Sequence, residues 1–395
     1  MNKYKSIINP TPIVTGITAL IISFMLVVFN VGNAYAFFWG DDTDYTPVEK
    51  AFEGYEPIQM FSYKTNRFCD GDIDIETDDT FDRKMRSSSS HGQVGYHRFA
   101  PTILGAVSAH MRAEFDPKQY SKNQEEFTDW VEYMVRMADK RIMTDNQWSG
   151  GGSPAYGQTV VLYSLAVFVN YMDVKNLWRM DQRESIVKWG DELYSNSHYN
   201  HHSNGDRTQG HRWPDTVARA SASYALWAVA TKNIKQFKDS YRDFKSLQKK
   251  IKANGAINQF FEGNYSGKLK KNTWDLYLET KTAGDMVVSA YMNELVGMPS
   301  FEVENKKGGS VKKFIKWIDE AHFGPTNKLS HKGWQDDRHI ENRRSDSTSW
   351  VSVYRLMDKS DSLPLVKNHL EITQYFGYSH AKVLTYSRCL TNELN

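Results

Sequence analysis

A helical periodicity that runs from about residue 96 to residue 357 constrains this chain more than any other feature. In residues 127–143 (FTDWVEYMVRMADKRIM), the large apolar side chains recur every three or four positions, as on one face of an α-helix: Trp130, Tyr133, Met134 and Met137. Residues 160–172 are apolar nearly all round, as in a helix buried on both sides. The same reasoning predicts helices at residues 183–194, 216–231, 234–251, 283–296, 311–321 and 347–357. Strand signals are weak and no short repeat period is present. The sequence therefore predicts a mainly α fold, with antiparallel helix pairs stacked around a centre.

The first 36 residues have the pattern of a secretory signal peptide. Lys3 and Lys5 form a short basic start, an apolar run follows over residues 17–31, and Ala34 and Ala36 supply the small residues of a cleavage site. An uncleaved membrane anchor is the alternative, because the apolar run is nearly long enough to span a bilayer. We expect cleavage, and hence a periplasmic or secreted protein that has no membrane contact afterwards.

The net charge and the composition limit which partners the protein can bind and indicate where its domains begin. Cleavage would remove two lysines and no acids, so the formal net charge would fall from +2 to zero. A neutral chain argues against nucleic acids and membrane surfaces as partners, and a polyanionic partner would need positive charge concentrated in one cleft. We expect a monomer. Residues 37–95 are polar and rich in Asp, Thr and Ser, which predicts an irregular arm with a lid-like loop before a catalytic domain at residues 96–395.

Cys69 and Cys389 are the two cysteines of the chain, one near each end of the mature protein. An even pair in an oxidising compartment indicates a disulfide, and two unpaired buried thiols are the alternative. Closing so long a loop would stabilise the fold by at most about 5–6 kcal/mol in the chain-entropy description.

The segment GDRTQGHRWPD at residues 205–215 groups cationic, amide and imidazole side chains before a predicted helix. Pro214 suits the first turn of that helix. The preceding residues would then lie at a helix N-terminus, where the helix dipole favours anions. Arg207, Gln209 and Arg212 could hold a carboxylate there, and His211 has a pKa suited to proton transfer near neutral pH. A solvated loop without a function is the alternative.

Two other clusters could carry chemistry. Residues 194–206 contain His198, His201, His202 and Asp206, side chains that can bind zinc, although their spacing matches no helical zinc motif. Further along, a group of lysines precedes Tyr277 and could lower the pKa of its phenol, which would make it a proton donor or acceptor. These lysines are Lys268, Lys270 and Lys271. An ordinary basic loop before an amphipathic helix is the alternative.

Aromatic residues make up 13% of the chain, with 11 Trp and 22 Tyr, and many of them lie beside polar residues. Ordinary packing accounts for most such residues, but a groove in which rings stack on sugar faces would also need them. The candidates are Trp148, Tyr156, Tyr199, Trp213, Trp274 and Trp334.

Taken together, these segments resemble the alginate lyases with an α/α-toroid fold, the poly-mannuronate lyases of the bacterial periplasm. FSYKTNRFCDGDIDIETDDTFDR (residues 61–83) looks like the family's F-x-x-K, mobile loop and T-F-R. GHRWPDTVARASASYALWAVATKN (residues 210–233) is similar to its N-N-H-x-Y-W segment and the helix after it. NGAINQFFEG…KKNTWDLY (residues 254–277) resembles the segment in which an arginine precedes the catalytic tyrosine. SDSTSWVSVYRLM (residues 345–357) looks like its C-terminal W-x-x-x-Y helix.

The resemblance implies a lyase that acts on an anionic polysaccharide and needs no metal or organic cofactor. It aligns Lys64 with the family's substrate-binding lysine, His211 with its catalytic histidine and Tyr277 with its catalytic tyrosine. Two positions depart from the family: Gly210 replaces an asparagine, and Lys270 or Lys271 replaces the arginine. These departures leave open a substrate other than polymannuronate, such as glucuronan.

β-Elimination on a 4-linked uronate requires neutralisation of the C6 carboxylate, removal of the C5 proton and protonation of the departing O4. Gln209, Arg212 and the lysines could neutralise the carboxylate, His211 or Tyr277 could act as the base, and Tyr277 could act as the acid. The arm that carries Lys64 could close over bound polymer. Further candidates for binding a neighbouring uronate are Arg343 and Arg344, with His97 and Arg98 as weaker ones.

Two other functions remain open at the level of sequence. One is a non-catalytic polysaccharide-binding or assembly protein, which the missing asparagine and arginine would favour. The other is a metal-dependent glycan hydrolase that uses His198, His201 and His202.

Overall fold

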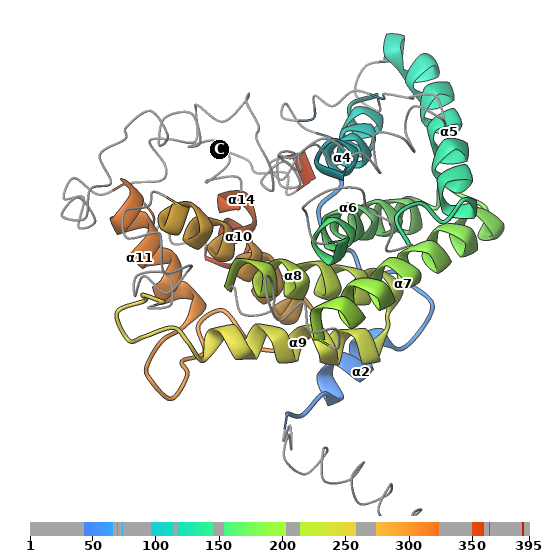
Figure 1. Ribbon diagram of the computed structural model, residues 1–395. Coiled ribbons are helices and arrows are strands. Elements are labelled where there is room, and N and C mark those ends of the chain that lie inside the picture. Colours follow the sequence, from blue (N-terminus) through green and yellow to red (C-terminus); the bar gives the residue numbers. More distant parts are fainter. Residues whose placement is uncertain are drawn as a thin grey trace, which may run out of the picture. The chain divides into compact units, whose positions relative to one another are not determined.

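The computed structural model describes residues 43–65, 69, 73, 96–113, 117–144, 154–202, 214–257, 274–323, 350–358, 363 and 389–390. Contacts along the chain separate a unit Met1–Tyr45 from a unit Thr46–Asn395, to which all the described helices belong (Figure 1). These helices are α2 (Thr46–Phe52), α4 (Tyr96–Ala113), α5 (Pro117–Asp139), α6 (Pro154–Lys175), α7 (Met180–His202), α8 (Pro214–Thr231), α9 (Ile234–Gln248), α10 (Trp274–Leu295), α11 (Val311–Phe323) and α14 (Val351–Met357). Within the described residues, β-type pairing is limited to isolated bridges between Ile251 and Ile257 and between Lys252 and Gly308.

Inner and outer helices alternate along the chain. The inner helix α8 packs against both α6 and α10, while α4 packs against α6 and α14 against α10. Each of four inner helices carries the outer helix that neighbours it in sequence: α5 on α4, α7 on α6, α9 on α8 and α11 on α10 (Figure 1). This alternation is that of an (α/α) toroid, so the predicted fold class is confirmed.

Small side chains explain the central place of α8. Its sequence, PDTVARASASYALWAVAT, is rich in alanine and serine, and its residues are buried continuously from Ala218 to Ala230. Short side chains let α6, α9 and α10 approach the α8 backbone together. α9 returns antiparallel to α8, because only two residues connect the helices and the two helices also contact each other far from this connection. There the Ser221 hydroxyl donates to the Ser240 carbonyl at 3.2 Å, and the Ser240 hydroxyl donates to the Ser221 carbonyl at 2.9 Å.

The turn between α8 and α9 and the contact between α7 and α8 are both tight. Lys232 adopts a left-handed conformation with φ of 55°, and the Asn233 side chain then caps α9 by accepting from the Gln236 backbone N–H at 3.2 Å. Gly190 on α7 lies so close to Trp227 that an added Cβ would be 2.1 Å from the indole ring. A glycine is therefore required at this crossing.

Several predicted helix limits were wrong. α5 begins ten residues before the predicted start, α7 continues past Tyr194 to His202, and α10 begins at Trp274 rather than at residue 283. The extensions of α5 and α7 are mainly polar, so an apolar stripe does not mark them, although each helix continues beyond its packed segment, whereas the missed start of α10 (WDLYLETKT) contains apolar residues. The predicted arm also contains the short helix α2. Pro214 does open α8, as the sequence predicted.

The segment at residues 58–63 is hydrogen-bonded to the helical core. Asn170 on α6 accepts from the Met60 backbone N–H at 3.0 Å and from the Tyr63 hydroxyl at 2.8 Å. The Tyr291 hydroxyl on α10 donates to the Met60 carbonyl at 2.9 Å. The disulfide between Cys69 and Cys389 is present, which confirms the predicted pairing. No helix among the described residues is long and apolar enough to cross a membrane.

Candidate active site

Helices α8 and α10 run parallel, and polar contacts between them define their register. The Arg219 Nε donates to Asp285 Oδ2 at 2.8 Å, across 66 residues of sequence. Further along both helices, the hydroxyls of Ser221 and Ser289 lie 3.1 Å apart. Ser221 follows Arg219 along α8, and its partner Ser289 follows Asp285 along α10. The two helices therefore run in the same direction and start at the same end of the fold. That end therefore receives the partial positive charge of two helix N-termini.

Asp215 on α8 and Lys281 on α10 lie one helical turn before Arg219 and Asp285, and they are also 66 residues apart in the sequence. The parallel register therefore sets this acid opposite this base. We call these four residues the charge ladder. The charge order is reversed between the helices: acid then base on α8, base then acid on α10. In an antiparallel arrangement, Asp215 would face Asp285 and Arg219 would face Lys281. The ladder thus stabilises the parallel arrangement and opposes the antiparallel one.

Burial changes along the ladder. The side chains of Arg219 and Asp285 are 5% and 3% exposed, whereas Asp215 and Lys281 are half-buried. Burial raises the pKa of both carboxyls, and the nearby positive charges of Arg219 and Lys281 oppose that rise. Oδ1 of Asp215 is shielded from solvent and accepts no hydrogen bond within the described structure. The inner rung of the ladder is therefore dry, and the outer rung is closer to solvent, near the helix N-termini.

Helix α6 adds an aromatic ring to the ladder. The guanidinium carbon of Arg219 lies 5.8 Å from the centroid of the Tyr163 ring, a cation–π distance. Burial raises the pKa of the Tyr163 phenol well above its usual value, so this tyrosine stays neutral. Three inner helices thus converge on one buried cation.

Of the predicted site residues, Lys64 and Tyr277 fall within the described chain. Lys64 is exposed and directly follows the buried Tyr63, whose hydroxyl bonds to α6. Tyr277 lies in the first turn of α10, one helical turn before Lys281, and its side chain is outside the description. The other predicted catalytic and substrate-binding residues lie outside the described residues: Arg207, Gln209, His211, Arg212, Trp213, Lys270, Lys271, Arg343 and Arg344.

The histidine cluster considered for zinc lies mainly on a helix rather than in a loop. His198, His201 and His202 belong to the last turns of α7. The His198 ring stacks on Tyr194 with a centroid distance of 5.4 Å, and its Nε2 lies 3.7 Å from a carboxylate oxygen of Asp239. No group of three or more histidine, cysteine or acidic side chains among the described residues is placed to hold a metal ion. Asp206 lies outside those residues.

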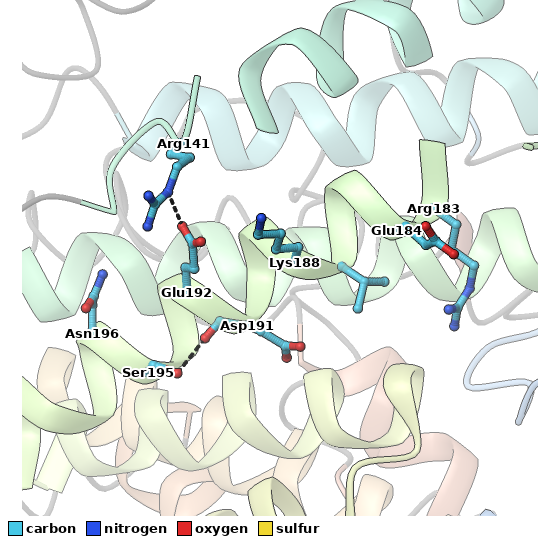
Figure 2. A pocket seen from close by; sticks show the side chains of 9 residues that line it. Arg141, Arg183, Glu184, Lys188, Asp191, Glu192, Ser195 and Asn196 are labelled. Carbon is cyan, nitrogen blue, oxygen red and sulfur yellow. Dashed lines mark hydrogen bonds and ion pairs between the residues drawn. The ribbon is translucent and has the colours of Figure 1, made fainter. Parts of the chain in front are cut away.

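A surface hollow of about 450 Å³ lies along α7 (Figure 2). Its lining residues are Arg141, Arg183, Glu184, Val187, Lys188, Asp191, Glu192, Ser195 and Asn196. Two of its cations are engaged in ion pairs: Arg141 with Glu192 at 2.6 Å and Arg183 with Asp173 at 2.9 Å. This pairing leaves little excess positive charge for a polyanion.

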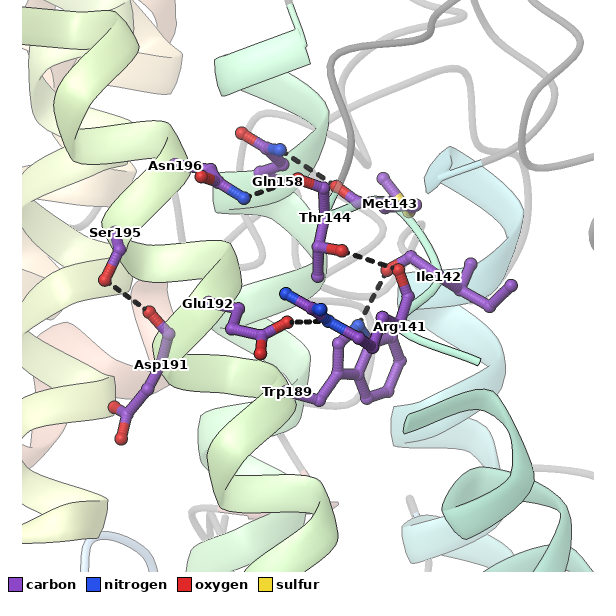
Figure 3. A network of polar contacts seen from close by, with 10 residues as sticks. All are labelled: Arg141, Ile142, Met143, Thr144, Gln158, Trp189, Asp191, Glu192, Ser195 and Asn196. Atoms are coloured by element: carbon purple, nitrogen blue, oxygen red, sulfur yellow. Dashed lines mark hydrogen bonds and ion pairs between the residues drawn. The ribbon is translucent and has the colours of Figure 1, made fainter. Parts of the chain in front are cut away.

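The same hollow is bordered by a structural clamp on the segment after α5 (Figure 3). The Trp189 indole donates to the Ile142 carbonyl at 2.7 Å, and the Gln158 amide donates to the Met143 carbonyl at 2.9 Å. Arg141 and Met143 adopt positive φ values of 51° and 64°, so α6 and α7 hold a left-handed turn in place. The polar groups at this edge of the hollow therefore hold the turn.

The sequence interpretation missed the charge ladder, although a signal for it exists. Arg219 is the one charged residue in the stretch from Thr216 to Thr231, and Asp285 is followed by the apolar run MVVSAYM. Single charges within buried helices are almost always paired. A search for two such charges of opposite sign would have selected Arg219 and Asp285.

No protein-family model and no curated protein matches the sequence. Among solved structures, the fold is similar to alginate lyase A1-III from Sphingomonas species A1, with 11% identity, a TM-score of 0.50, and coverage of 81% of this chain and 88% of that one. Two variants of alginate lyase A1-III, each complexed with a tetrasaccharide, are also similar. One has a histidine replaced by alanine (12% identity, TM-score 0.50), the other a tyrosine replaced by phenylalanine (13% identity, TM-score 0.51), and both cover 84% of this chain and 88% of theirs. At this identity the likeness shows a shared α/α-toroid fold.

Proposed function

We propose that this protein is a polysaccharide lyase that cleaves a 4-linked polyuronate by β-elimination. The observation that carries the proposal is the parallel register of α8 and α10. The separation of 66 residues that relates Arg219 to Asp285 is also the sequence separation between His211 and Tyr277, and Tyr277 lies on α10 one turn before Lys281. His211 precedes the start of α8 and lies outside the described residues, so we infer its place beside Tyr277, at the end where the two helices start, from this separation.

The chemistry of that end suits a uronate. Two helix N-termini favour an anion, and Gln209 and Arg212 are our candidates for binding the C6 carboxylate. Neutralising that carboxylate stabilises the negative charge that develops when the C5 proton leaves. His211 or Tyr277 acts as the base, and Tyr277 protonates the departing O4; each proton transfer contributes about 10²–10⁴-fold to the rate.

The similar solved structures support the substrate class. Two of them are complexes of an alginate lyase with a tetrasaccharide, in variants that replace a histidine or a tyrosine. For the rest of the substrate path we propose contacts from a set of cationic and aromatic side chains: Lys64, Arg207, Trp213, Lys270, Lys271, Arg343 and Arg344. With a cleaved signal sequence and the disulfide between Cys69 and Cys389, we expect the enzyme in the periplasm or outside the cell.

A panel of polyuronates tests the proposal. Elimination creates a double bond conjugated to the carboxylate, so ultraviolet absorbance should rise when the protein meets its polymer. The activity should survive EDTA and should be lost in His211→Ala and in Tyr277→Phe. His201→Ala should keep the activity, because His201 belongs to the alternative metal site. Absence of any absorbance gain on alginate, polymannuronate, polyguluronate and glucuronan would refute the proposal, and loss of activity with EDTA and in His201→Ala would favour a metal-dependent hydrolase.

A further inference from the structure

The outer rung of the charge ladder is half-buried, unlike the inner rung. Arg219 and Asp285 are enclosed, and their bond at 2.8 Å satisfies both charges. Lys281 and Asp215 lie one turn nearer the helix N-termini and retain partial exposure. The positive charge of Lys281 opposes the rise that burial causes in the pKa of Asp215, so an ammonium group lies near this carboxyl at the less enclosed end of the ladder.

Lys281 also lies on the same face of α10 as Tyr277. Residues four positions apart on a helix are neighbours on one face, so Lys281 is one turn inward from the proposed catalytic tyrosine. Its flexible side chain, with an ammonium group at the tip, can extend by several ångströms along the helix toward the N-terminal end.

We propose that Lys281 is a substrate-binding residue whose ammonium group meets the uronate carboxylate, and that Asp215 positions this ammonium from the facing turn of α8. The inference rests on the proposed lyase function and names a source of positive charge within the described structure. Lys281 would supply this positive charge in addition to Lys270 and Lys271, which stand where the resemblance leads one to expect an arginine.

The negative charge of Asp215 does not cancel this role. Asp215 lies in the first turn of α8, where the helix dipole stabilises a carboxylate. The dipoles of two parallel helices add positive potential at the same end, so the surroundings of Lys281 remain favourable to a second anion. The substrate carboxylate would then share the ammonium, which has three hydrogen-bond donors, with Asp215.

The test compares Lys281→Met with Lys281→Arg, and uses Lys316→Met on the exposed face of α11 as a matched control. Binding of a polyuronate that the wild-type protein cleaves is measured by calorimetry, beside kcat and KM. Lys281→Met should weaken binding by about tenfold or more and lower kcat/KM by about 10²-fold. Lys281→Arg should recover most of both, and Lys316→Met should match wild type. All variants should keep the wild-type melting temperature within about 2 °C.

The salt dependence of binding separates a charge contact from a structural role. Loss of one contact between a cation and a polyanion reduces the slope of log Kd against log salt by about one, measured between about 50 and 200 mM salt. We expect this reduction in Lys281→Met and in neither of the other variants. If wild type cleaves a polyuronate while Lys281→Met binds it with the same affinity and slope, the inference is wrong and the lyase proposal stands. If wild type neither binds nor cleaves any polyuronate, the lyase proposal itself fails.

Discussion

Replacing Arg219 with methionine tests whether the charge ladder holds α8 and α10 together. The side chains of Arg219 and Asp285 are almost fully enclosed, at 5% and 3% exposure. Removal of one partner from a buried pair leaves the other charge uncompensated and typically costs about 3–5 kcal/mol. For a unit of about 350 residues, this corresponds to a fall in Tm of about 4–7 °C. Replacing both residues, as in Arg219→Met with Asp285→Leu, should recover most of the loss, because neither charge then remains buried.

The destabilisation of Arg219→Met should also depend on pH. Burial raises the pKa of Asp285, and Arg219 opposes that rise. Without the arginine the folded-state pKa rises further above the unfolded value. A raised folded-state pKa contributes stability below the unfolded pKa, and this contribution is lost as pH rises through the folded pKa. The loss of stability relative to wild type should therefore be larger at about pH 8 than at about pH 5.

Urea unfolding at both pH values, followed by far-ultraviolet circular dichroism, measures these differences. Arg179→Met is the matched control, since Arg179 forms its ion pair at the surface with 62% exposure and its removal should change the unfolding midpoint little. A cost below about 1 kcal/mol for Arg219→Met, or a double variant as unstable as the single one, would contradict the proposed role of the ladder.

Three further changes test separate parts of the fold. Cys69→Ser removes a disulfide that closes 320 residues of sequence and should lower the free energy of unfolding by up to about 5–6 kcal/mol. In dithiothreitol, which reduces the disulfide of the wild-type protein, the variant and the wild type should be equally stable. A large difference between them under that condition would argue against the disulfide. Gly190→Ala should cost about 1–3 kcal/mol in denaturant titrations because the new Cβ would collide with Trp227, while Ser195→Ala on the same helix should cost less than about 0.5 kcal/mol; equal effects would show that the crossing has room. His110 is buried, its Nδ1 lies 2.6 Å from the Tyr171 hydroxyl, and burial, followed by Lys175, lowers its pKa to about 4. A lowered histidine pKa gives stability above the unfolded pKa of about 6.5, and this stability is lost as pH falls. The free energy of unfolding of wild type should therefore fall by up to about 3 kcal/mol between about pH 7 and pH 4. His110→Gln should show a smaller fall, and an equal fall in both proteins would contradict the prediction.

The sequence predicted the fold class well because buried helices leave strong periodic signals. The apolar run around α6 and the Ala- and Ser-rich run of α8 are both visible in the residue pattern, and Pro214 marked the start of α8. The polar ends of α5 and α7 were missed, because backbone hydrogen bonds and local propensity extend a helix beyond its packed segment. The pairing of Cys69 with Cys389 was predicted from the expected export of the protein rather than from spacing.

The site was predicted less completely, for a different reason. Chemistry-bearing residues near 211 and 277 could be selected one by one, but the register between α8 and α10 depends on tertiary packing. The isolated charges of Arg219 and Asp285 are visible in the sequence, but no sequence pattern states that these two residues, 66 positions apart, bond to each other and so fix the register. The structure supplies that register, and with it the role proposed for Lys281.

The mass of the reaction products tests the central claim, elimination on a polyuronate, most directly. Mass spectrometry of oligosaccharides released from a polyuronate in water labelled with heavy oxygen distinguishes the two ways of breaking the bond. Elimination adds no water, so we predict fragments with an unsaturated end, a mass lower by one water than the hydrolysis product, and no label introduced by cleavage. Fragments that gain one labelled water for each bond broken would show hydrolysis and contradict the account.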